Sequence, residues 1–338
     1  MKTAAVDFRS DNVAPAADEV MRGLAELGPQ AASPYGDDDV TQRLPALLTE
    51  VFGQTAVGWP VPTGTAANAM TISALLPEGG VVVCHERAHA LRSEEGATTY
   101  ANPRIRFVAL PGEDGRLDPA SCEAALRSVS GPKLLTLTQA NEYGCAYDLP
   151  SLAALSDTAR RTGARLHLDG ARLAAACCAL DISPRDVVAA ARPDALALGL
   201  TKVGAMSSDA AIFFEASLPQ DWRATMRRSG FLSSKMRYQS IQIHILMRTG
   251  LWLELARHAV EMSQRLRQGL ETASGVIWVR PSQSNVLLVE FTDTVRNAFA
   301  ASPFLVKQWI DPKLTRLVTS HATQVDEVDQ FIAWLRAI

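Results

Sequence analysis

Short apolar runs alternate with amphipathic segments along the first 240 residues of the chain. The apolar runs predict buried strands at Val81–Cys84, Leu134–Thr138, Arg165–Leu168, Ala195–Leu198 and Ala211–Phe214. The amphipathic segments predict helices at Ala66–Leu76, Pro119–Val129, Pro150–Thr162 and Pro184–Ala191. Buried strands that alternate with helices indicate an α/β fold whose central sheet is mostly parallel and covered on both faces.

The pattern changes after residue 240. A helical stretch without proline is expected from about Ser240 to Ser274. Further elements follow at Val276–Val279, Asn285–Phe291, Pro303–Trp309, Arg316–Val318 and, as a final helix, Val325–Ala337. We therefore expect a large domain, 1–240, with an N-terminal segment, 1–14, and a small C-terminal α+β domain, 241–338. A boundary inside the long helix is the open alternative.

Composition narrows the class of protein. The chain has 338 residues, of which 47% are hydrophobic and 20% charged, and these values exclude disordered, collagenous and coiled-coil classes. A net charge of -3 favours neither nucleic acid nor an acidic membrane surface as a partner, and no apolar run is long enough to span a membrane. Five cysteines without ligand spacing argue against a disulfide framework and against a metal site. Since no apolar signal segment is recognisable near the first residue, a cytoplasmic location is expected.

The strand ends are where chemistry is expected, because ligands of such sheets bind beyond the carboxyl ends of the strands. Before the first predicted helix stands Pro62–Asn68, with Gly64 and Thr65. Glycine lets an anion approach the backbone, Thr65 can cap the helix, and the helix N-terminus offers free N–H groups. The segment is thus a candidate phosphate cradle, with a plain turn and helix cap as the alternative.

Two ionisable residues follow other predicted strands. Asp169 ends one strand, where a carboxylate needs a cation or hydrogen-bond donors. It can pair with Arg172 or with a protonated ring nitrogen of a cofactor. Lys202 comes shortly after Ala195–Leu198, and a desolvated lysine is nucleophilic toward a carbonyl. An exposed loop lysine is the alternative, although only six of the 33 basic residues are lysine.

The three features together match the needs of pyridoxal phosphate. Its phosphate needs N–H donors, its aldehyde needs an amine, and its ring nitrogen needs an anion. The sequence therefore predicts an enzyme that uses pyridoxal 5'-phosphate as cofactor.

The chain also resembles the low-specificity L-threonine aldolases, a family of fold-type I pyridoxal-phosphate enzymes with an aspartate-aminotransferase-like fold. The resemblance covers nearly the whole chain. It is densest at Asp7–Asp11, Tyr35–Asp38, Pro62–Thr65, His167–Arg172, Thr201–Lys202 and Arg316–Thr319.

The resemblance implies roles for individual residues. Lys202 matches the Schiff-base lysine, and Asp169 matches the partner of the pyridine nitrogen. The remaining cofactor contacts are implied for Gly64, Thr65, Arg172, the ring-stacking His89 and, across a subunit interface, Arg237. The residues that match groups holding the substrate carboxylate are Ser10, Arg172 and Arg316. Guanidinium groups suit that task because they bind a carboxylate with two parallel hydrogen bonds.

Two positions depart from the family pattern. Many members carry an E-N-T-H-N run after the strand that ends near residue 137, and its histidine is replaced here by Asn141, which would face the substrate. Asparagine is no base at neutral pH, so His89, His85, a phosphate oxygen or an ordered water would take the proton of the substrate hydroxyl. His85 itself stands where the family has an aspartate.

The implied reaction is the reversible cleavage of L-threonine, L-allo-threonine or a related L-β-hydroxy-α-amino acid such as phenylserine to glycine and an aldehyde. A β-eliminating lyase or an aminotransferase would use the same cofactor contacts, and a non-enzymatic phosphate-ligand protein is a third alternative. The resemblance also implies a homodimer or homotetramer with active sites at the subunit interface.

Overall fold

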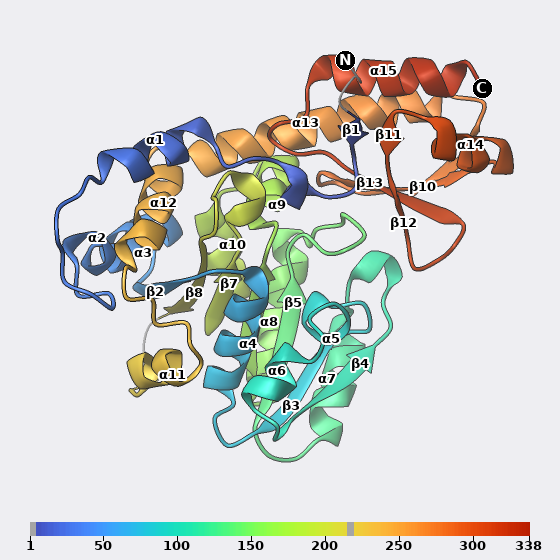
Figure 1. The fold of residues 1–338 in the computed structure, drawn as a ribbon. Helices are drawn as coiled ribbons and strands as arrows, with labels where there is room; N and C mark the ends of the chain where they lie inside the picture. The colour runs from blue at the N-terminus through green and yellow to red at the C-terminus, as the bar shows by residue number, and fades with distance from the viewer. Residues whose placement is uncertain (1–4, 215–219) are drawn as a thin grey trace.

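The computed structural model describes residues 5–214 and 220–338. Its central seven-stranded sheet has the order β2-β8-β7-β6-β5-β3-β4 (Figure 1). The strands are β2 (Ala56–Val61), β3 (Gly80–His85), β4 (Ile105–Leu110), β5 (Lys133–Thr138), β6 (Arg165–Gly170), β7 (Ala195–Leu198) and β8 (Asp209–Phe214). Only β8 runs antiparallel to its neighbours, β2 and β7, so the expected, mostly parallel α/β sheet is confirmed. The sequence did not predict β2 and β4; β2 contains Gly58 and Pro60, which weaken a strand signal.

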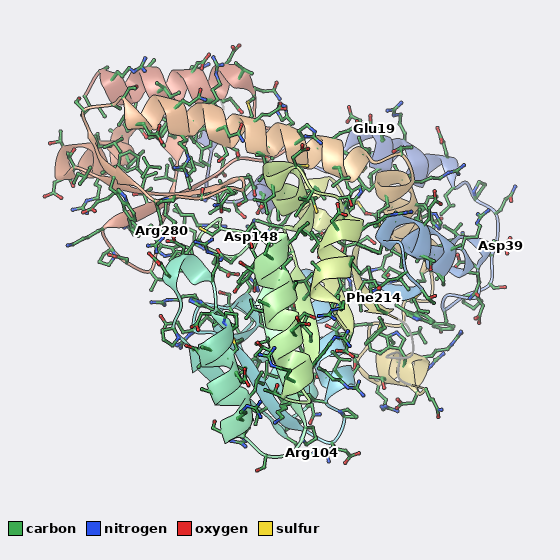
Figure 2. All side chains as sticks on the ribbon, turned by 180° about the vertical axis from the view of Figure 1, so that it is seen from behind. Glu19, Asp39, Arg104, Asp148, Phe214 and Arg280 are labelled. Atoms are coloured by element: carbon green, nitrogen blue, oxygen red, sulfur yellow. The ribbon has the colours of Figure 1, made fainter. Side chains whose placement is uncertain are left out.

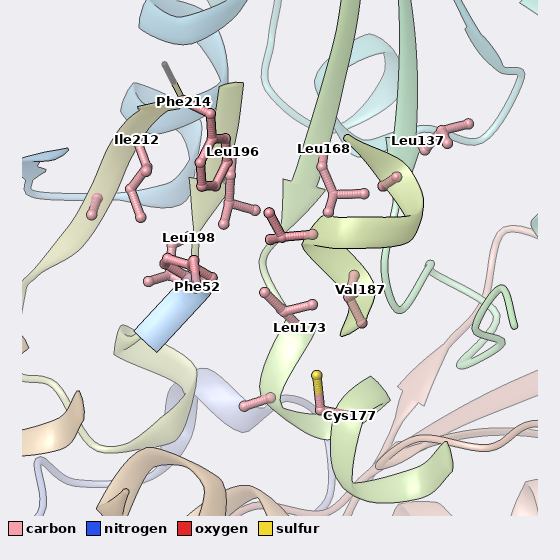
Figure 3. Packing of buried hydrophobic residues seen from close by; sticks show 14 of the residues in the cluster. Phe52, Leu137, Leu168, Leu173, Cys177, Val187, Leu196, Leu198, Ile212 and Phe214 are labelled. Carbon is pink, nitrogen blue, oxygen red and sulfur yellow. The ribbon is translucent and has the colours of Figure 1, made fainter. Parts of the chain in front are cut away.

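Helices cover both faces of this sheet, as the alternation of buried residues requires. Val82 packs with the helix α4 (Gly64–Leu75) on one face, whereas Val81 and Val83 pack into the apolar cluster of the other face. That second cluster, part of which Figure 3 shows, holds residues of helices α3 (Leu44–Phe52), α7 (Pro119–Ser128), α8 (Leu149–Arg161), α9 (Leu173–Leu180) and α10 (Pro184–Ala191).

Shorter elements connect and flank these layers. The helices are α1 (Asp18–Glu26), α2 (Asp39–Gln42), α5 (His89–Arg92), α6 (Ala97–Ala101), α11 (Trp222–Arg228) and α14 (Asp293–Ala298). The single-turn 3₁₀ helices are η1 (Asp11–Val13), η2 (Glu113–Gly115), η3 (Thr201–Val203) and η5 (Phe299–Ala301). Within residues 5–214 and 220–338, no helix combines the length and the apolar character that a membrane crossing needs.

The C-terminal part is an antiparallel sheet with two long helices beside it (Figure 1). The sheet order is β12 (Lys307–Gln308), β13 (Leu314–Val318), β10 (Val286–Phe291) and β9 (Val276–Val279). Helices α13 (Leu251–Glu271) and α15 (Val325–Arg336) pack against each other. The single helix expected over Ser240–Ser274 is wrong: α12 (Arg237–Arg248) ends before Gly250, whose φ of 79° is left-handed, a conformation that glycine adopts readily.

The N-terminal segment lies on the C-terminal part before it reaches the central sheet. Strand β1 (Val6–Asp7) pairs with β11 (Phe304–Leu305), and Phe8 packs edge-on against Phe331 at 5.4 Å between ring centroids. The following turn, η1, then contacts η3. This route brings Ser10 and Asp11 to the ends of the central strands.

The two parts of the molecule share α13. Ala256 belongs to the apolar cluster of the central sheet, whereas Met262, further along the same helix, belongs to that of the C-terminal sheet. A domain boundary at 240/241 stays a prediction. Arg280, after β9, lies where the two parts meet (Figure 2), because its guanidinium pairs with Asp114 at 2.7 Å and covers the ring of Tyr143.

Candidate active site

A cavity of about 680 Å³ opens beyond the carboxyl ends of the central strands, with walls from both parts of the molecule. Its position follows the rule for open α/β sheets. The predicted site residues on its wall are Ser10, Gly64, Thr65, His89, Arg172, Lys202 and Arg316. The structure therefore brings together residues that are up to 306 positions apart in the chain.

The N-terminus of α4 forms one wall of the cavity. Thr63 is its N-cap, because the Thr63 hydroxyl accepts a hydrogen bond from the Ala66 N–H at 3.1 Å. The expectation that Thr65 caps this helix is wrong, since Thr65 lies one residue inside it. The N–H groups of Gly64 and Thr65 precede the first intrahelical bond, from Ala67 N to Thr63 O. They are free to bind an anion such as a phosphate.

Asp209, the first residue of β8, fixes the loop that carries Lys202. One of its carboxylate oxygens accepts hydrogen bonds from the backbone N–H groups of Leu200 at 2.7 Å and Thr201 at 2.9 Å. Burial raises the pKa of Asp209, although these N–H groups and the charge of Lys202 oppose the rise. The sequence analysis did not single out Asp209, although a carboxylate as the first residue of an apolar strand could have indicated it.

Lys202 itself lies in η3, half-buried on the cavity wall. Among residues 5–214 and 220–338, no carboxylate lies within ion-pair distance of its amine. Its side-chain nitrogen therefore stays available to a ligand, unlike that of a surface lysine in a salt bridge.

Asp169 lies at the end of β6, buried beneath the cavity wall. It accepts hydrogen bonds from the backbone N–H of Ala171 at 3.0 Å and from the side chain of Asn68 at 3.1 Å. The alternative ion pair between Asp169 and Arg172 does not form, because Arg172 pairs with Asp11 instead. Asp169 thus has two neutral donors and, within the described residues, no cationic partner.

A buried hydrogen-bond chain joins Asp169 to His89. Asn68 donates to Asp169 and, at 2.8 Å, to Glu94. Glu94 also lies 2.8 Å from Nδ1 of His89, and its side chain is fully buried. Because an ionised carboxylate only accepts hydrogen bonds, Nδ1 of His89 is the donor. Burial lowers the pKa of His89, but the bond to Glu94 and the nearby carboxylates outweigh burial and raise it.

The two predicted substrate arginines differ in how they are held. Arg172 is buried and paired with Asp11, which also accepts a hydrogen bond from Asn285 at 3.2 Å. Arg316 donates from Nη1 to the backbone oxygen of Arg9 at 3.2 Å, and its buried Nε has no acceptor among the described residues. Burial lowers the pKa of Arg316 to about 10, which leaves it cationic at neutral pH. Ser10 caps η1, and its side chain reaches the same wall.

Two predicted residues are placed elsewhere. His85 is buried with both ring nitrogens against backbone groups, Nε2 to Gly112 O and Nδ1 to Arg87 N, so a role as base at the cavity does not fit. Asn141 is also away from the cavity wall, which its neighbour Glu142 lines instead.

Arg237 does not line the cavity of its own chain. It lies beside the ring of Tyr238, with its guanidinium carbon 5.1 Å from the ring centroid. The buried Nε of Arg237 has no acceptor within the described part of the chain. Its role in an adjacent subunit stays a prediction.

The cavity residues fit pyridoxal phosphate. The N-terminus of α4 can bind its phosphate, Lys202 has a free amine for its aldehyde, and Asp169 lacks a cation that would compete with its ring nitrogen. Across residues 5–214 and 220–338, no three His, Cys, Asp or Glu side chains come together as metal ligands would. The groups on the cavity wall are donors that an organic phosphate needs.

Comparisons with known proteins agree with this arrangement. The family model described as beta-eliminating lyase matches residues 7–293. A low-specificity L-threonine aldolase of Pseudomonas sp. is 30% identical over 98% of this chain and 97% of its own length. That of Pseudomonas aeruginosa is 29% identical with the same coverage. The solved threonine aldolase of Leishmania major superposes with a TM-score of 0.90 at 27% identity, over 98% of this chain and 99% of that chain.

Proposed function

The chain, which the beta-eliminating lyase model matches over residues 7–293, belongs to the low-specificity L-threonine aldolases, and we propose that it is a lyase. Its reaction uses pyridoxal phosphate and cleaves L-β-hydroxy-α-amino acids reversibly to glycine and an aldehyde. L-Threonine and L-allo-threonine are the primary substrates of this proposal. The observation that carries it is the single cavity that joins Lys202, the N-terminus of α4 and Arg316. Trp309 and Ile310 on the same wall support an aromatic substrate such as phenylserine as well.

The cofactor site uses groups that the fold already holds in place. When bound, pyridoxal phosphate supplies a ring that stabilises negative charge at the substrate Cα. The N–H groups at the start of α4 would hold its phosphate, and Lys202 would hold its aldehyde carbon. Asp169, fixed by Ala171 and Asn68, would keep a proton on the ring nitrogen.

The substrate carboxylate is the handle by which the protein orients the amino acid. Arg316 has a buried Nε to offer, and Ser10 adds a hydroxyl. Fixing the carboxylate fixes rotation about the bond between Cα and the amine nitrogen, and this rotation decides which bond at Cα breaks. The two Pseudomonas relatives, which match 98% of this chain, are named as aldolases. Their names favour cleavage of Cα–Cβ over β-elimination or transamination.

The deciding measurement is product identity. Protein loaded with pyridoxal phosphate is incubated with L-threonine, L-allo-threonine or phenylserine, and the products are identified. Glycine and the matching aldehyde support the proposal, whereas ammonia and a keto acid support elimination. Lys202→Ala should lose both the visible absorbance of the lysine-bound cofactor and nearly all turnover, while the exposed control Lys313→Ala keeps both. Full turnover in Lys202→Ala contradicts the assignment.

The quaternary structure is a further part of the proposal. We expect a homodimer or homotetramer in which Arg237 reaches a neighbouring cofactor phosphate. The buried Nε of Arg237, which has no acceptor among the described residues, supports this expectation. Light scattering tests it, since a monomer that is active and binds the cofactor contradicts it. A cytoplasmic location likewise stays a prediction of the sequence.

A further inference from the structure

The loop after β5 has a geometry that selects which of its side chains faces the cavity. Asn141 is a structural residue of this loop: its side chain donates to Asp114 O at 2.9 Å and accepts from the N–H groups of Tyr143 at 3.0 Å and Cys145 at 3.2 Å. Gln139 is likewise bound on both sides to the backbone of Tyr147. These bonds hold the turn closed, and Glu142 at its tip lines the cavity.

The carboxylate of Glu142 has no side-chain partner among the described residues, and the one hydrogen bond that lowers its pKa comes from its own backbone N–H. By contrast, Asp11, Glu94 and Asp169 are each bonded to another side chain. It lines the same cavity as His89, Arg172 and Arg316. An unpaired carboxylate there is costly for stability, which points to a use in binding or chemistry.

The charges around Glu142 come from several elements. His89 of α5 and Arg172 at the start of α9 favour its ionised form, and Asp169 of β6 opposes it. Arg316 of β13 also senses its charge. Burial is the largest effect and, with Asp169, raises the pKa of Glu142. A carboxylate of raised pKa suits proton transfer near neutral pH.

We propose that Glu142 is the general base that takes the proton of the substrate β-hydroxyl. This inference rests on the proposed function and names the group that the sequence could not identify. As the O–H bond breaks, the proton passes to a Glu142 oxygen and the O–Cβ bond becomes the aldehyde carbonyl. The Cα–Cβ bond breaks, its electron pair stays with Cα, and protonation of Cα gives glycine. Glycine and the aldehyde together contain all the atoms of the substrate, so the reaction needs no oxidant or reductant.

The other candidate bases are committed elsewhere. Both ring nitrogens of His85 are bonded to backbone groups. Nδ1 of His89 is bonded to Glu94, which leaves Nε2 as the one acceptor on that ring. Glu94 itself is fully buried behind His89.

The test compares Glu142→Gln with a matched control. Glu86→Gln is suitable because Glu86 follows β3 as Glu142 follows β5, but is exposed and absent from the cavity wall. In the cofactor-loaded enzyme, kcat for threonine cleavage should fall about 10²–10⁴-fold in Glu142→Gln and stay unchanged in Glu86→Gln. Exchange of the glycine α-proton with solvent, followed by NMR, needs no hydroxyl chemistry and should persist in Glu142→Gln.

A second readout is independent of turnover. The infrared difference between wild type and Glu142→Gln should contain a protonated carboxyl band that titrates above the ordinary glutamate pKa. Cleavage by Glu142→Gln within threefold of wild type overturns the inference while leaving the aldolase intact. If wild type neither cleaves threonine nor exchanges glycine, the proposed function has failed instead. Glu142→Asp, which keeps the carboxylate, should recover part of the lost kcat and shows that the site is folded.

Discussion

Asp11 and Arg172 form a buried, two-bond ion pair between the N-terminal segment and the start of α9. Nε of Arg172 lies 2.7 Å from Oδ2 of Asp11, and Nη2 lies 2.9 Å from Oδ1. The side chains are only 1% and 9% exposed, respectively. Arg172 therefore reaches the cavity with its charge already balanced, whereas Arg316 has no acidic partner among the described side chains.

Removal of Asp11 should destabilise the fold. Asp11→Asn leaves a buried guanidinium without its counter-charge, so the free energy of unfolding should fall by about 3–5 kcal/mol. The control is Asp329→Asn, because the ion pair of Asp329 with Arg265 is about half exposed on both sides and should be worth about 0–1 kcal/mol. Urea denaturation measures both, and equal losses would contradict a special role for Asp11.

The same pair predicts a pH dependence. Burial alone would raise the pKa of Asp11, but the charges of Arg172, Lys202 and Arg316 lower it far below the ordinary value. Because the pKa of Asp11 is lower in the folded than in the unfolded protein, its ionised carboxylate stabilises the fold fully above the unfolded pKa of about 4. This stabilisation is lost as the pH falls below that value. In acid titrations followed by circular dichroism, Asp11→Asn should therefore lose less stability below about pH 4 than wild type.

Arg316 should control substrate affinity. Arg316→Gln removes a charged donor from the wall, and since hydrogen bonds to charged groups contribute about 1.5–3 kcal/mol, KM for threonine should rise roughly 10- to 100-fold. Arg316→Lys should recover only part of this, because an ammonium cannot bind a carboxylate with two parallel bonds. Arg265→Gln, on the surface, is the control. An unchanged KM in Arg316→Gln would remove Arg316 from the carboxylate site.

Glu94 should set the protonation of His89. The hydrogen bond from His89 to Glu94 is one of the effects that raise the pKa of His89, so Glu94→Gln should lower it. A histidine whose pKa is raised by folding stabilises the fold below its unfolded pKa of about 6.5, and this stabilisation is lost as the pH rises through the folded pKa. The variant should therefore lose stability relative to wild type mainly below about pH 6.5. Histidine NMR titration measures the shift, with His244, bonded to Val40 O, as the internal reference that should not move.

His167 should make the fold sensitive to mild acid. It is fully buried, with Nε2 3.0 Å from the hydroxyl of Thr71, and burial lowers its pKa to about 4. The unfolded chain takes up the proton near pH 6.5, so stability is complete above that pH and falls by roughly 3 kcal/mol between pH 6.5 and 4.

The variant His167→Gln tests this dependence. Its unfolding free energy should fall less than that of wild type over the same interval, measured by urea denaturation at pH 7.5, 6, 5 and 4. The two proteins share all other titrating groups, so the difference between their curves reports His167. Parallel curves would show that His167 does not titrate as its burial requires.

The local pattern of the sequence was enough for most of the core architecture. Apolar runs predicted β3, β5, β6, β7 and β8, and the amphipathic segments predicted α4, α7, α8 and α10, but not α5, α6 or α9. The strand-end rule then placed Lys202 and the start of α4 at one cavity. These inferences succeed because strand burial and helix periodicity are properties of neighbouring residues.

Other features depended on contacts between distant segments. The left-handed conformation of Gly250 divides a stretch that reads as one helix. Asp11, Glu94 and Asp209 are unremarkable acids until the fold buries each against its partner.

The turn after β5 illustrates the difference most directly. The sequence alone determined that polar residues follow this strand, and it favoured Asn141 as the one near the substrate. The tertiary structure decided otherwise, because the side chain of Asn141 is bonded to Asp114, Tyr143 and Cys145 and leaves the cavity to Glu142. Periodicity shows which positions are buried, but only the packing of remote segments shows which polar group has its hydrogen bonds satisfied within the protein and which is free for a substrate.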